Sequence, residues 1–107
     1  MIHWHDKIYL GEDIKSEYKN IRAKLEKGES PFGLYVIALS SNKSEQLDIF
    51  RADMFTRSRR LYPEPTVVGL ARGKKEAEEL VALMAFDSYE KTGKVDLRKL
   101  FDLSIGS

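Results

Sequence analysis

The fold is decided by residues 66–89, which read Thr66-Val-Val-Gly-Leu-Ala-Arg-Gly-Lys-Lys-Glu-Ala-Glu-Glu-Leu-Val-Ala-Leu-Met-Ala-Phe-Asp-Ser-Tyr89. A short apolar run, rich in β-branched residues at its start, passes through Gly69 and Gly73 into a long helical pattern. This change of period predicts a strand from Thr66 to Ala71, a tight turn, and a helix from Gly73 to about Lys91.

The segment before this unit contains a second strong helical pattern, from Glu12 to Lys27. Its apolar residues are spaced four, three and four apart, as expected for one buried stripe on an otherwise charged helix. Gly28 is a natural stop, and Pro31 prevents continuation. The stripe consists of Ile14, Tyr18, Ile21 and Leu25.

Two further strands are expected between the helices. Phe32 to Leu39 is almost continuously apolar, which predicts a strand covered on both faces. Leu47 to Arg51 is shorter and more polar, as in an edge strand, and the polar turn before it favours an antiparallel hairpin. A short helix over Ala52 to Leu61 follows, with Met54, Phe55 and Leu61 available for the core.

The ends of the chain give weaker patterns. Lys7 to Leu10 is typical of a short strand, and the residues before it are expected to fray. Asp96 is a suitable cap for a final turn or two of helix ending at Leu103. The imidazoles of His3 and His5 would face one way on an extended segment, but two histidines do not make a metal site.

The order strand, helix, strand, strand, helix, strand, helix predicts an α+β fold in one domain over residues 1–107. Two arrangements fit: a ferredoxin-like unit with an extra helix, and a small mixed or antiparallel sheet of three to four strands packed with helices. The ferredoxin-like order requires Lys7 to Leu10 and Leu47 to Arg51 as central strands. Phe32 to Leu39 and Thr66 to Ala71 are more apolar, so we favour the second arrangement.

Composition limits the classes of function. Lys and Arg total 18 and Asp and Glu 17, so a net charge of +1 gives no general attraction to nucleic acid or membranes. The chain has no cysteine, which excludes disulfides and thiolate metal sites. No signal peptide is apparent, and no apolar run approaches the roughly 18 residues that span a bilayer. We expect a cytoplasmic protein without membrane contact.

The long helix is apolar over a wider arc than packing on a sheet requires. Ala77, Leu80, Val81, Met84 and Ser88 share one face, and Leu83, Phe86 and Tyr89 share a neighbouring one. Either the first helix or the C-terminal segment (Leu100, Phe101 and Leu103) covers this second face, or the face forms a homodimer. We favour cover from within the chain.

A basic stretch offers an alternative site. The turn from Gly69 to Lys75 is one residue too short for a phosphate-binding loop, and Lys75 replaces its hydroxyl residue. Helix-start amides beside basic side chains are still suited to an anion, although nearby glutamates already complement the helix dipole. The candidate anion-binding residues are Arg57, Arg59, Arg60, Arg72, Gly73, Lys74 and Lys75. A solvated basic face is the simpler interpretation, and nucleic acid is an unfavoured partner.

The runs Phe32-Gly-Leu-Tyr-Val-Ile-Ala-Leu-Ser-Ser-Asn42, Leu47-Asp-Ile-Phe50 and Val67-Val-Gly-Leu-Ala-Arg-Gly-Lys-Lys-Glu-Ala-Glu-Glu-Leu-Val81 resemble small uncharacterised bacterial proteins of similar length. This resemblance implies a bacterial cytosolic domain and assigns no functional residue.

No nucleophile motif or acid/base pair is apparent, so we expect neither an enzyme nor a cofactor. The sequence predicts a small interaction or regulatory module that acts through protein contacts on the long helix, with a protein or a second copy as partner. Leu83, Phe86 and Tyr89 are its candidate interface.

Overall fold

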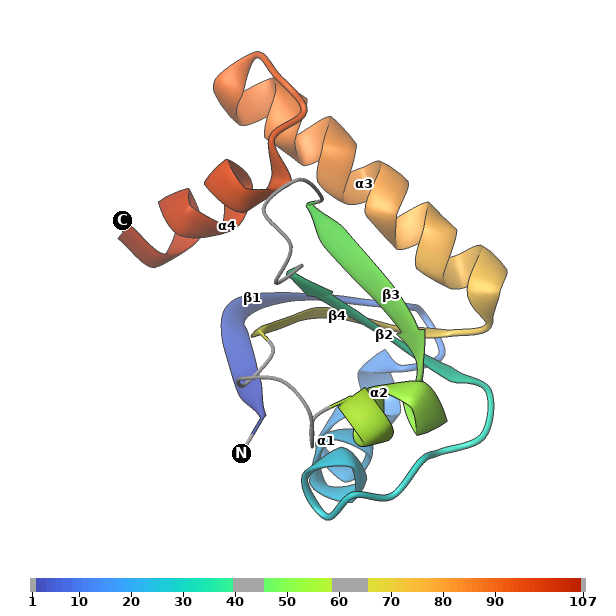
Figure 1. The fold of residues 1–107 in the computed structure, drawn as a ribbon. Coiled ribbons are helices and arrows are strands. Elements are labelled where there is room, and N and C mark those ends of the chain that lie inside the picture. The colour runs from blue at the N-terminus through green and yellow to red at the C-terminus, as the bar shows by residue number, and fades with distance from the viewer. Residues whose placement is uncertain (1, 40–45, 59–65, 107) are drawn as a thin grey trace.

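The computed structural model describes residues 2–39, 46–58 and 66–106. A four-stranded sheet is packed with helices, which confirms the α+β class (Figure 1). The elements are β1 (His3–Leu10), a 3₁₀ turn (Lys15–Glu17), α1 (Tyr18–Glu26), β2 (Leu34–Leu39), β3 (Leu47–Arg51), α2 (Ala52–Ser58), β4 (Thr66–Arg72), α3 (Lys74–Thr92) and α4 (Leu97–Gly106).

The sheet has the order β1-β4-β2-β3. β1 runs parallel to β4, whereas β2 is antiparallel to both β4 and β3, so the sheet is mixed. The two most apolar strands are the inner ones and β3 is at an edge, as the sequence predicted. This order excludes the ferredoxin-like arrangement, because that topology would place β1 and β3 inside.

Each face of the sheet carries its own core. Successive residues of a strand point to opposite faces. In β4 Val67 and Leu70 belong to one core while Val68 and Ala71 belong to the other, because a register shift between Val67 and Gly69 interrupts the strict alternation. The first core includes buried residues of α1 and α2, and the second those of α3 and α4. Figure 1 shows α1 and α2 at one end of the view, with α3 and α4 across the sheet from them.

The N-terminal strand is longer than predicted, and the expected fraying is wrong. β1 begins at His3 and is held by helices on both sides of the sheet. The indole of Trp4 donates to Glu26 of α1 at 2.7 Å. The buried ring of His5 accepts the Lys7 amide at 2.9 Å and lies 3.0 Å from the Phe101 carbonyl of α4. These distant partners order the segment.

The helix boundaries also differ from the prediction. The first helix begins as a 3₁₀ turn at Lys15, and regular α-helix starts only at Tyr18. The last helix extends beyond the predicted turn or two, as far as Gly106. Its start is as expected, since the Asp96 carboxylate accepts the Lys99 amide at 3.1 Å.

Candidate functional site

The described residues of the candidate anion site come from three different elements. The backbone of Arg57 lies in α2, whereas Arg72 ends β4 and Lys74 begins α3. The side chain of Arg57, and Arg59 and Arg60 altogether, lie outside the described residues. The Arg72 guanidinium donates to Glu17 at 2.9 Å and to the Phe32 carbonyl at 3.3 Å, so its charge is partly used within the protein.

The turn before α3 is also engaged by its own chain. Gly73 has a positive φ of 88°, and its amide donates to the Gly33 carbonyl at 2.8 Å. The Arg72 amide donates to the Glu76 carboxylate at 2.8 Å. Two donors near the helix start are therefore occupied, while Lys74 and Lys75 have exposed side chains. Fewer backbone amides are therefore available to an anion than the sequence indicated. Anion binding at this turn stays a prediction.

The second candidate surface is the outer face of α3. Leu83, Phe86 and Tyr89 are 48%, 60% and 60% exposed. The prediction that the chain covers this face is wrong for these residues. α4 packs beside α3 and places Leu97, Leu100 and Phe101 in the core that α3 shares with the sheet, instead of over the outer face. The exposed Ala82 lies one turn before Phe86, and together the four residues are termed the α3 ridge.

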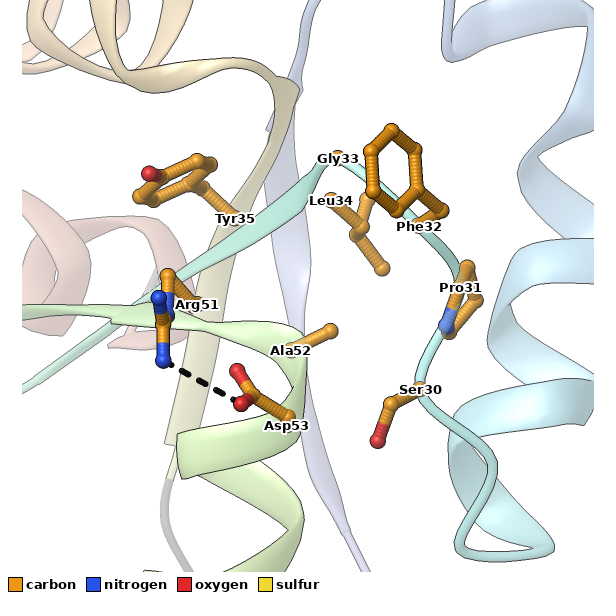
Figure 2. Close-up of a pocket in the computed structure, with 9 residues that line it drawn as sticks. All are labelled: Ser30, Pro31, Phe32, Gly33, Leu34, Tyr35, Arg51, Ala52 and Asp53. Atoms are coloured by element: carbon orange, nitrogen blue, oxygen red, sulfur yellow. Dashed lines mark hydrogen bonds and ion pairs between the residues drawn. The ribbon is translucent and has the colours of Figure 1, made fainter.

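The third candidate is a cavity of about 440 Å³ at the end of the β2–β3 hairpin. Tyr35 and Arg51 are the last paired residues at the open end of that hairpin, and the two segments diverge beyond them. Figure 2 shows the β2 lead-in on one side of the cavity and the β3–α2 junction on the other. This fork pocket is lined by Ser30, Pro31, Phe32, Gly33, Leu34, Tyr35, Arg51, Ala52 and Asp53.

The fork pocket was not predicted, because Phe32 had been assigned to a strand covered on both faces. Instead β2 begins at Leu34, and the Phe32 side chain is 97% exposed. The Leu34 amide donates to the Pro31 carbonyl, and Gly33 has a φ of 74°, as in a turn that needs glycine at its third position. The Pro-x-Gly spacing was the available signal for this turn.

A polar cluster joins β1 to α3. The Tyr9 phenol donates to the Asp87 carboxylate at 2.5 Å. Burial and this bond raise the pKa of Tyr9 well above its ordinary value of 10.0. Burial and the neighbouring Lys91 ammonium lower the pKa of Lys7, whose ammonium also lies over the Tyr9 ring. The Tyr9–Asp87 hydrogen bond therefore links α3 to the edge strand β1.

Within the described ranges, no group of three or more histidine, aspartate or glutamate side chains is arranged to hold a metal ion. None of the described helices is both long enough and apolar enough to cross a membrane. Comparisons with protein-family models, curated proteins and solved structures find no match. The candidate sites therefore have to be judged on their own geometry.

Proposed function

We propose that the chain is a non-enzymatic interaction module that pairs with a second copy of itself through the α3 ridge. The observation that carries this proposal is the exposure of Leu83, Phe86 and Tyr89 on a helix whose opposite face is fully packed. Apolar residues that neighbour one another on a helix surface form a continuous contact strip, and such strips are typical of protein interfaces.

A second copy suits the ridge because of its symmetry. A two-fold axis perpendicular to α3 pairs the helices antiparallel, which also opposes their dipoles favourably. With the axis at the level of Met84, Phe86 of each copy faces the small Ala82 of the other. Large and small side chains alternate across such a contact, as close packing of two helices requires.

The charged residues at the ends of the ridge support the antiparallel orientation. Lys75 precedes the ridge and Glu90 follows it, and both are exposed. In this pairing Lys75 lies about three residues, or roughly 4.5 Å along the axis, from the level of Glu90 in the other copy. A lysine side chain spans that offset. A parallel pair would instead bring like charges together at each end.

The test measures molar mass by size-exclusion chromatography with light scattering, across a concentration series. The wild-type protein is expected at twice the monomer mass at high micromolar concentration, and Phe86→Glu at the monomer mass. Met54→Glu is the matched control, since Met54 is an exposed apolar residue of α2, across the sheet. A wild-type monomer, or loss of the dimer in the control as well, would refute the proposal.

Charge exchange tests the orientation separately. Lys75→Glu and Glu90→Lys should each weaken the dimer, and the double variant should restore it, because the antiparallel pair then has both charges reversed. Failure of the double variant to recover excludes the antiparallel register.

The resemblance to small bacterial proteins and the absence of cysteine support a bacterial cytoplasmic setting for this module.

A further inference from the structure

The fork pocket combines aromatic and aliphatic surface with one charged pair. Pro31, Leu34 and Ala52 supply aliphatic lining, and the aromatic residue Phe32 lies at the rim. The Tyr35 side chain packs instead against the core on the α3 and α4 side of the sheet. The volume of the pocket, about 440 Å³, is at the smaller end of the range of roughly 300–1,000 Å³ typical of ligand pockets. The ring of Phe32 is almost fully exposed, so it is accessible to a ligand at the rim of the pocket.

The charged pair consists of Arg51 and Asp53, joined by one contact of 3.2 Å (Figure 2). Their side chains are 61% and 43% exposed. Such exposed pairs contribute only about 0–1 kcal/mol, so exchanging each partner for a ligand group costs little. A guanidinium has five N–H donors, and that of Arg51 makes one hydrogen bond within the described part of the chain.

We infer that the fork pocket binds a small zwitterionic molecule with an aromatic group, of the chemical class of the aromatic α-amino acids. The ligand carboxylate is received by Arg51, and the ligand ammonium by Asp53. The aromatic group contacts Phe32 and the aliphatic lining of Pro31 and Leu34. A ligand that carries only a negative charge would leave Asp53 beside its carboxylate, and one that carries only a positive charge would meet Arg51.

This inference goes beyond the dimer proposed above and does not depend on it. The fork pocket lies between the β2 lead-in and the β3–α2 junction, and none of its lining residues belongs to the α3 ridge. Variants of one surface should therefore leave the other unaffected. Phe86→Glu is expected to disrupt the proposed dimer, and ligand titration of this variant should give the same affinity as the wild type.

The experiment titrates the whole chain with three matched probes and follows the amide signals of Gly33 and Ala52 by nuclear magnetic resonance. The probes are L-phenylalanine, 3-phenylpropionate, which lacks the ammonium, and phenethylamine, which lacks the carboxylate. Saturable shifts are expected with phenylalanine. The other two probes should bind about ten-fold more weakly or worse, since each loses one charge-assisted hydrogen bond.

Variants then assign the contacts. Arg51→Gln and Phe32→Ala should each weaken phenylalanine binding several-fold, and both replace exposed side chains, so the spectrum should stay dispersed. Lys75→Gln is the control, because it removes an exposed cation elsewhere. Absence of saturable shifts, equal affinity for all three probes, or unchanged binding in Arg51→Gln would each overturn the inference.

Discussion

The two faces of α3 have similar apolar content but different surroundings. The inner face is completely packed against the sheet and α4, whereas the ridge on the outer face meets solvent. Consecutive residues of a helix are 100° apart, so the six apolar residues from Val81 to Phe86 cannot all face one core. Apolar character alone therefore does not indicate a contribution to the core, and the surplus on the outer face requires a different explanation.

The largest expected loss of stability on substitution is on the inner face of α3, at Met84. This side chain is fully buried, and its terminal methyl lies so close to Gly69 that a Cβ there would be 3.0 Å away. Met84→Ala should lower the free energy of unfolding by about 2–5 kcal/mol, because it leaves a cavity between helix and sheet. Chemical denaturation measures this loss.

Met54→Ala is the matched control, since Met54 is 44% exposed. Its effect should stay within about 1 kcal/mol, as expected away from a packed core. Equal losses of unfolding free energy in Met84→Ala and Met54→Ala would contradict the packing of the inner face of α3 against the sheet.

The inner face also contains one buried polar group, Ser88. Its hydroxyl oxygen accepts the Asp96 amide at 2.8 Å and lies 2.9 Å from the Lys94 and Asp96 carbonyls. Ser88→Ala should cost about 1–3 kcal/mol of unfolding free energy, because the Asp96 amide loses its acceptor. Ser16→Ala, at an exposed serine, should change stability far less. A similar small loss in both variants would contradict a fastening role for Ser88.

A third prediction concerns the border between the two faces, where Asp87 accepts the Tyr9 phenol. Tyr9→Phe should lower the free energy of unfolding by about 1–2 kcal/mol near neutral pH, since a hydrogen bond to a carboxylate is lost. The folded pKa of Tyr9 is raised, so the bond's contribution is fully present below pH 10.0 and is lost as pH rises through the folded value.

Denaturation of wild type and Tyr9→Phe over a pH series checks this dependence. The difference between the two proteins should be constant in neutral solution and shrink above pH 10.0, where tyrosine in the unfolded chain ionises. Taking the difference removes the titration of the other tyrosines. A difference that grows with pH would contradict the assigned cause.

Much of the fold was predictable because its signals are local. The spacing of Ala77, Leu80, Met84 and Ser88 identifies a buried helix face without knowledge of what covers it. Nearly continuous apolar sequence likewise identified β2 and β4 as inner strands. Order in β1 was not predictable in this way, because His5 depends on Phe101, which is 96 residues distant. A local pattern cannot report such a partner.

The candidate sites were predicted unevenly for the same reason. The residues of the α3 ridge belong to one helix, so their proximity follows from sequence spacing alone. Their exposure does not, since it depends on where α4 packs. The fork pocket joins two separate segments, one containing Phe32 and the other Arg51 and Asp53. Neither segment suggests a cavity before the β2–β3 pairing is known.

The smallest expected change in monomer stability lies on the outer face. Phe86→Ala removes an exposed ring, so at low protein concentration the free energy of unfolding should change by only about 0.5 kcal/mol. Association that favours the folded state makes the melting temperature depend on protein concentration. That dependence should be present in the wild type and absent in Phe86→Ala. A large loss of stability at low concentration would show instead that Phe86 supports the monomer, and the division between an anchoring and an associating face of α3 would then fail.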